Sequence, residues 1–184
     1  MFRIKHHGAV TGVTGSCHQL ILDDDNSLLV DIGLFQGAET SGKGADADRL
    51  AIEFDITDVR ALVITHVHID HVGRLPYLLA AGFDGPIYCS KPSAELLPLV
   101  IEDTLKVGVT RDRQLIEKCL QRIRTQLVPL EYIQWQPLAT KGGPQTWLRL
   151  SPAGHILGSA YVTVRVNKSG AGQGNKYWDV VFSG

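Results

Sequence analysis

The stretch ALVITHVHIDHVG, residues 61–73, decides the fold and the chemistry of this 184-residue chain. Residues 61–65 are apolar or β-favouring, and such a short run predicts a fully buried strand. Directly behind it come four side chains of the kinds that bind metal ions: His66, His68, Asp70 and His71. The order of strand and then ligands indicates a functional loop on a rigid scaffold.

The spacing of these residues favours a metal site over a packed or solvated cluster. In an extended segment alternate side chains share a face, so His66 and His68 can point at one metal ion. The chain must then turn, and Asp70 and His71 can reach a second position beside the first. A lone histidine is more often a core or surface residue than a ligand. Burying three imidazoles and a carboxylate without a partner would be costly, however, whereas a divalent metal ion satisfies all of them.

The pattern His-x-His-x-Asp-His resembles the signature of the metallo-β-lactamase superfamily. Further matches resemble its β-CASP branch, which comprises RNA-processing nucleases and some DNA-repair nucleases. They are Gly8-Ala9, VTGSCH at residues 13–18, LVDIG at residues 29–33, Phe35-Gln36-Gly37, and AGHILGSA at residues 153–160. These matches cover nearly the whole chain, and their order is that of the family.

The resemblance implies an α/β (α+β) fold, the metallo-β-lactamase-like αβ/βα sandwich, with one or two metal ions at the edge of the paired sheets. Residues 1–184 are then expected to form the N-terminal part of that domain, without the β-CASP domain and the C-terminal part. In the family the strand that ends at Phe182-Ser183-Gly184 runs on into an aspartate that bridges two metals. The 184-residue piece is therefore expected to hold at most one metal tightly and to have little or no activity. Its exposed sheet surface would favour a homo-oligomer.

By the same resemblance, one further histidine completes the metal site. The expected metal ligands are His66, His68, Asp70, His71 and His155. Three of them (His66, His68 and His155) would bind one ion, and three protein ligands with an open position are typical of catalytic zinc. Manganese or iron would also suit such ligands. Asp70 would orient the attacking hydroxide, and Asp31, at the end of the strand LLVD, would hydrogen-bond a ligating residue.

The bulk composition bounds the class of protein. The length fits one domain with a substantial core, and 44% hydrophobic and 20% charged residues are those of an ordinary globular protein. The net charge of −1 gives no global basic field for nucleic acid. A local groove could still be basic, with Lys5, Arg74 and Lys91 as contributors, although each is more often a solvated surface residue. Three unclustered cysteines and the lack of a signal peptide or membrane span indicate a cytoplasmic protein with reduced thiols.

Hydrophobic periodicity predicts the remaining elements. Strands are expected at residues 2–5, 19–22, 27–32, 86–90, 147–150, 160–166 and 177–182, the last two as a hairpin. Helices are expected at residues 72–82, 92–107 and 111–124. Gly82 would end the first helix, and Ser90 or Ser93 would cap the second. The Gly-rich residues 36–48 and 170–175 are expected to be a loop near the site and the hairpin tip.

The leading hypothesis is a metal-dependent phosphodiesterase, a nuclease that uses a metal-activated hydroxide and acts on RNA, with DNA as the alternative substrate. Two metal ions are expected in the complete protein. One rival is a small-molecule hydrolase of the same superfamily, acting on thioesters or lactones, against which the VTGSCH and AGHILGSA matches speak. Another is a non-catalytic RNA-binding scaffold subunit. Such relatives typically lose ligands from the histidine motif, and this chain has kept them.

Overall fold

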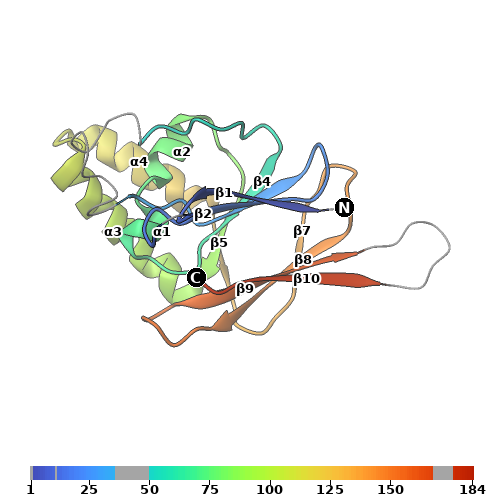
Figure 1. The fold of residues 1–184 in the computed structure, drawn as a ribbon. Coiled ribbons are helices and arrows are strands. Elements are labelled where there is room, and N and C mark those ends of the chain that lie inside the picture. Colours follow the sequence, from blue (N-terminus) through green and yellow to red (C-terminus); the bar gives the residue numbers. More distant parts are fainter. Residues whose placement is uncertain (1, 11, 36–49, 168–175) are drawn as a thin grey trace.

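Two β-sheets and a layer of helices make up the computed structural model, which describes residues 2–10, 12–35, 50–167 and 176–184 (Figure 1). The first sheet has the order β1-β2-β3-β4-β5-β6. Its strands are β1 (Arg3–Gly8), β2 (Cys17–Ile21), β3 (Ser27–Val30), β4 (Val59–Val63), β5 (Ile87–Ser90) and β6 (Leu127–Leu130). The strands from β1 to β3 pair antiparallel, and those from β3 to β6 pair parallel.

The second sheet is antiparallel throughout, with the order β10-β9-β8-β7. Its strands are β7 (Gln136–Leu138), β8 (Thr146–Pro152), β9 (Ala160–Asn167) and β10 (Tyr177–Phe182). The predicted hairpin of β9 and β10 is confirmed, with Trp178 opposite Val166 and Phe182 opposite Val162. The segments 36–48 and 170–175, predicted as loops, lie outside the described residues, so those predictions are not tested.

Within the described residues, four helices provide the crossovers from β4 to β5 and from β5 to β6. They are α1 (Ile69–Val72), α2 (Leu75–Ala80), α3 (Lys91–Gly108) and α4 (Arg113–Gln126). The first two connect β4 to β5, and the second two connect β5 to β6. Parallel neighbours need such crossovers, since a tight turn reverses the chain.

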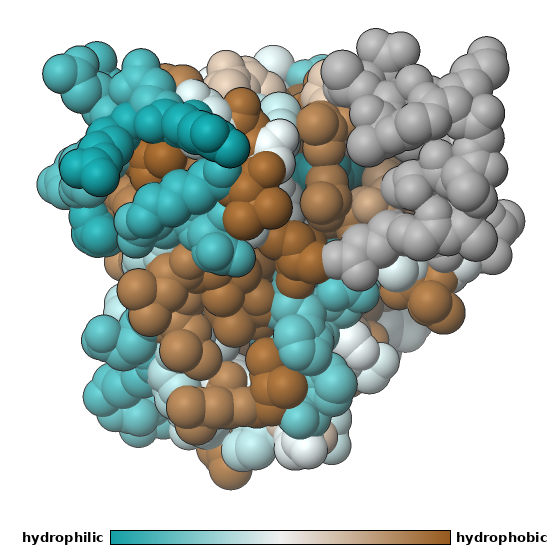
Figure 2. All heavy atoms as spheres, turned by 90° about the vertical axis from the view of Figure 1, so that its left-hand side faces the viewer, coloured by the Kyte–Doolittle hydropathy of each residue, from teal (hydrophilic) through white to brown (hydrophobic). Residues whose placement is uncertain are grey.

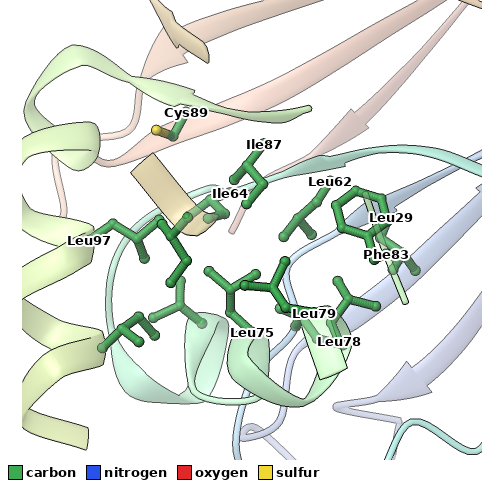
Figure 3. Packing of buried hydrophobic residues seen from close by; sticks show 14 of the residues in the cluster. Leu29, Leu62, Ile64, Leu75, Leu78, Leu79, Phe83, Ile87, Cys89 and Leu97 are labelled. Atoms are coloured by element: carbon green, nitrogen blue, oxygen red, sulfur yellow. The ribbon is translucent and has the colours of Figure 1, made fainter. Parts of the chain in front are cut away.

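Alternate side chains along the strands of the first sheet point to opposite faces, and each face packs into its own hydrophobic core. Leu62 of β4 and Ile64 directly after it face the helices, whereas Ala61 and Val63 of β4 face the second sheet. Figure 3 shows the helix-side core, where Leu75, Leu78 and Leu79 of α2 lie close to strand residues such as Leu62. The other core is closed by inward residues of β8 and β9. The order is therefore helices, sheet, sheet, the first part of the predicted αβ/βα order, and the predicted mixed α/β fold class is confirmed.

The helix predicted at residues 72–82 is wrong in its start and its continuity. The chain becomes helical earlier, at Ile69, so Asp70 and His71 lie on a short helix. It then breaks before α2, because Pro76 has no N–H to donate to the preceding turn. The predicted stop is right: Gly82 has φ +104°, and the Gly82 and Phe83 amides donate to the carbonyls of Leu79 and Leu78.

The remaining differences are small. β6 and β7 were not predicted. The helix predicted at 92–107 is one residue longer at each end, as α3, and the helix predicted at 111–124 lies two residues later, as α4. Ser90 is the residue that caps α3, accepting a hydrogen bond from the Ser93 amide. All three cysteines are free, as expected. No helix within the described ranges is both long and apolar enough to cross a bilayer.

Two exposed surfaces carry apolar side chains. On the helical side, brown apolar atoms gather between hydrophilic ones (Figure 2), and a groove of about 340 Å³ runs between α2, α3 and α4. On the outer side of the second sheet, Tyr161, Tyr177 and Val181 are exposed. Self-association through that sheet stays a prediction.

The two-sided burial of β4 gives a test of the fold. Leu62→Ala removes a fully buried side chain from the helix-side core and should reduce the free energy of unfolding by about 2–5 kcal/mol. Leu99→Ala makes the same chemical change on α3, where the side chain is 62% exposed, and should change it by less than about 0.5 kcal/mol. Urea unfolding followed by circular dichroism measures both. Equal losses would contradict this packing.

Candidate metal centre

The loop after β4 brings two imidazoles together. β4 ends at Val63, the chain bends at Thr65, and His68 is again extended, with φ −63° and ψ 148°. The side chains of His66 and His68 therefore share a side, and His66 Nε2 lies 3.1 Å from His68 Nδ1. The prediction that these two residues point to one place agrees with this geometry.

A third imidazole arrives from the other sheet. His155 lies in the loop between β8 and β9, and its Nε2 is 3.2 Å from His68 Nδ1. The ligand atoms of His66, His68 and His155 all lie within 4.8 Å of one another. The rings stand nearly perpendicular in each pair, at 76°, 87° and 81°. This cluster could hold one metal ion by three nitrogens, which leaves coordination positions open for water or substrate.

The loop that carries His155 is fixed from two sides. The hydroxyl of Ser159 accepts hydrogen bonds from the amides of His155 and Ile156. The hydroxyls of Ser90 and Ser93, at the start of α3, donate to the Gly158 carbonyl at 2.6 and 3.0 Å. Gly158 has φ +87°, a conformation that suits glycine. The third histidine is thus positioned by a helix N-terminus that belongs to the first sheet's crossover.

Asp31 lies under this cluster and supports it. It is 1% exposed, and its carboxylate accepts hydrogen bonds from the Thr65 amide at 2.8 Å and the Thr65 hydroxyl at 2.9 Å. Thr65 Oγ1 is also 3.0 Å from His66 Nδ1. If that ring nitrogen carries the proton, it donates to Thr65, and Nε2 is left to face the metal position. Burial lowers the pKa of His66 to about 4, with the neighbouring His71 adding to the effect, so this ring is neutral at pH 7.

The predicted ligands Asp70 and His71 lie beside the three histidines rather than among them. The His71 ring is 3.9 Å from the His66 ring, and its Nδ1 is 2.7 Å from Asp31 Oδ2. Its Nε2 therefore faces Asp70, whose Oδ2 is 3.8 Å away. Burial opposes the charge on His71, but the hydrogen bond and charge of Asp31, with Asp70, outweigh it and raise the pKa. Asp70 and His71 thus lie next to each other beside the three-histidine cluster, and their role as ligands of a second metal ion stays a prediction.

Several residues that shape the site were not predicted from sequence. Ser16 donates to Asp31 Oδ2 at 3.2 Å, and Thr65 links Asp31 to His66. In the sequence Thr65 is one more β-favouring residue of the predicted strand 61–65, so nothing in the local pattern indicates its contacts with Asp31 and His66. Ser90 and Ser93 were considered only as helix caps.

Arg74 is not available to a basic groove. It is 4% exposed, its Nε donates to the Gly33 carbonyl at 2.7 Å, and its guanidinium lies over the Phe35 ring. The sequence did not indicate this burial, because arginine side chains are mostly exposed. Lys91 is exposed and pairs with Glu131.

A comparison with known families agrees with this arrangement. The family model of the metallo-β-lactamase superfamily matches residues 13–166, which is most of the chain. The chain belongs to the metallo-β-lactamase superfamily. The predicted resemblance, including its β-CASP branch, is confirmed.

Curated relatives of this superfamily protein are longer than it. Ribonuclease TTHA0252 from Thermus thermophilus is 38% identical over 89% of this chain and 35% of its own length. Transcription termination factor FttA from Methanocaldococcus jannaschii is 30% identical over 90% of this chain and 25% of its own. Integrator complex subunit 11 from Danio rerio is 28% identical over 86% and 27%. The chain thus spans about a third or less of the length of these relatives.

The Gly158 contact gives a test of how His155 is held. Gly158→Ala would place a Cβ 2.5 Å from Ser93 Oγ and 2.8 Å from the Ser93 amide nitrogen, so the loop must shift. Gly142→Ala has the same type of backbone strain, with φ +66°, but nothing within 4 Å of its Cβ. Both should lose about 1–2 kcal/mol of stability. Only Gly158→Ala should also weaken zinc binding, by roughly 10- to 100-fold.

Zinc affinity is measured by competition with a chromophoric chelator, and stability by urea unfolding. Equal zinc affinity in the two variants would show that the contact of α3 with the Gly158 carbonyl does not position His155.

Proposed function

We propose that the protein is a metal-dependent phosphodiesterase that cleaves RNA. The observation that carries the proposal is the cluster of His66, His68 and His155, whose ligand atoms lie within 4.8 Å of one another. It occurs in a chain of the metallo-β-lactamase superfamily whose relatives include a protein named a ribonuclease. The assignment of residues 1–184 to the N-terminal part of a larger catalytic domain stays a prediction.

The residues present fit a divalent metal ion. Imidazole nitrogens suit zinc, manganese and iron, and zinc is the metal we propose for three histidines with open positions. When bound, such an ion lowers the pKa of water and polarises a phosphate oxygen. His66 offers a neutral ring at pH 7, since burial lowers its pKa to about 4.

The other residues of the chain act on the orientation of the ligands and of the attacking water. Thr65 and Asp31 hold the His66 and His71 rings in place by hydrogen bonds. Asp70 is partly exposed beside His71, and its carboxylate would accept a proton or a hydrogen bond from the attacking water. We propose that Asp70 and His71 also contribute ligands to a second metal position.

A test of the reaction uses the protein as encoded by its gene, with all sequence that flanks residues 1–184. Cleavage of labelled single-stranded RNA should be lost with EDTA and restored by zinc or manganese. His66→Ala should abolish it because a ligand is removed. His7→Ala should retain it, since His7 bonds to Gln19 and stacks on Phe54, outside the cluster.

The substrates in the same assay separate the alternatives. DNA of the same sequence and a generic thioester are run beside the RNA. Thioester hydrolysis without RNA cleavage would identify a small-molecule hydrolase, and RNA binding without cleavage in the presence of metal would identify a scaffold subunit. Undiminished RNA cleavage by a preparation shown to be metal-free would overturn the proposal.

The number of ions held by residues 1–184 gives a second test. Within the described residues only His66, His68 and His155 bring three ligand atoms together. A site with three protein ligands should bind more tightly than one with two. Elemental analysis after desalting should therefore find one equivalent of metal per chain, and His155→Ala should lose it. Two tightly held equivalents would show that the ligand assignment is incomplete.

A further inference from the structure

A second group of imidazoles lies on the strands that precede the metal centre. Three of the seven histidines (His6, His7 and His18) are outside the ligands considered so far. His6 on β1 is the direct cross-strand partner of His18 on β2. Their Nδ1 atoms are 2.8 Å apart, and their rings are 4.8 Å apart at an angle of 82°. The two nitrogens therefore face each other at hydrogen-bond distance.

This geometry closely resembles that of the three-histidine cluster. His66 and His68 have ring centroids 4.8 Å apart at 76°, and His68 and His155 have centroids 4.9 Å apart at 81°. Nitrogen separations in that cluster are 3.1 and 3.2 Å. In both places the rings stand nearly perpendicular, and a nitrogen of one ring lies close to a nitrogen of the next.

We propose that His6 and His18 form an accessory site for a divalent transition-metal ion, separate from the three-histidine cluster. Nitrogens 2.8 Å apart subtend about 90° at an ion with bonds of about 2.0 Å. That angle suits the tetragonal coordination of Cu²⁺ or Ni²⁺, and Zn²⁺ with added waters. The site binds more weakly than the three-histidine cluster, because no third His, Cys, Asp or Glu of the described chain joins it.

The surroundings of the pair leave space and a fixed ring for such an ion. His6, His18 and Ser16 line a cavity of about 390 Å³ that reaches Asp31, Thr65 and His71 beside the three-histidine cluster and admits the waters that complete the coordination. His18 is half-buried, its ring is stacked 6.1 Å from that of Phe182 on β10, and its Nε2 lies 3.5 Å from Ser16 Oγ. Burial, with His6 beside it, lowers the pKa of His18, so its ring is neutral and able to bind metal at pH 7.

The alternative for the pair is a hydrogen bond between two neutral rings. One Nδ1 must then carry a proton and the other must accept it, so one ring is the Nδ1–H form. The net gain from that bond is small, because His6 is exposed and water competes for it. A metal ion requires the opposite proton arrangement: both Nδ1 atoms are unprotonated, and both rings carry the proton on Nε2.

This difference in proton position gives the experiment. The chain of residues 1–184 is labelled with ¹⁵N at histidine, its tight site is filled with one equivalent of zinc, and zinc is then titrated further. Long-range ¹H–¹⁵N spectra report the protonated nitrogen of each imidazole. We expect His6 and His18 to become Nε2–H rings with metal-shifted Nδ1 signals, in step with each other. A pair that keeps one Nδ1–H through the titration would overturn the proposal.

Substitutions locate the ion. His6→Ala and His18→Ala should each abolish the zinc-dependent shift at the remaining partner, and retention of the tight equivalent shows that each variant is folded. His7→Ala is the matched control and should keep the shift, because the His7 ring stacks on Phe54 and bonds to Gln19 instead of facing His18. Zinc-dependent shifts at His18 that persist in His6→Ala would place the ion elsewhere and contradict the proposal. The result does not depend on whether the protein cleaves RNA.

Discussion

The structure around the metal centre depends on the burial of the Asp31 carboxylate. At 1% exposure it has lost nearly all its water, and an unpaired carboxylate in such a place costs several kcal/mol. Its hydrogen bonds come from Ser16, Thr65 and His71, which belong to three separate segments. Each of these segments must therefore stay in contact with the end of β3. The Asp31 carboxylate therefore both holds these segments together and orients the histidine side chain of the site that it contacts.

The end of β3 also fixes the backbone of the short helix α1. The amides of Ser16, Ile32 and Leu34 donate to the carbonyls of Asp70, His71 and Ile69 at 2.9, 2.8 and 3.0 Å. The close approach leaves no room for a side chain at Gly33, where a Cβ would lie 1.6 Å from the Asp70 carbonyl oxygen. The second sheet is tied to the same place, since the Ala160 amide donates to the Thr65 carbonyl. The candidate ligands on both sheets are thus held in position by contacts with the segments that follow β3 and β4.

Sequence alone predicts the local part of this arrangement and misses the non-local part. Alternation along an extended segment is enough to place His66 and His68 side by side. His155 is 87 residues from His68, and only the family resemblance connects them. The helix after the ligands was predicted as continuous because its apolar residues are periodic. The periodicity does not reveal the break, where Pro76 has no N–H to donate. Arg74 and Thr65 were misjudged for a related reason: their roles come from partners that fold against them, which local sequence does not contain.

The pKa values of His66 and His71 shift in opposite directions although their rings are in contact, and the fold accounts for the difference. His66 and His71 have rings 3.9 Å apart, yet burial lowers the pKa of His66 to about 4, whereas Asp31 raises that of His71. The difference follows from contact, because Asp31 touches the His71 ring directly and reaches His66 only through Thr65. A metal ion at the proposed three-histidine position would therefore displace no proton from His66 at pH 7, while an ion at His71 would compete with a proton that Asp31 holds more tightly. On the proposed ligand assignment, the three-histidine position would fill before the one beside Asp70.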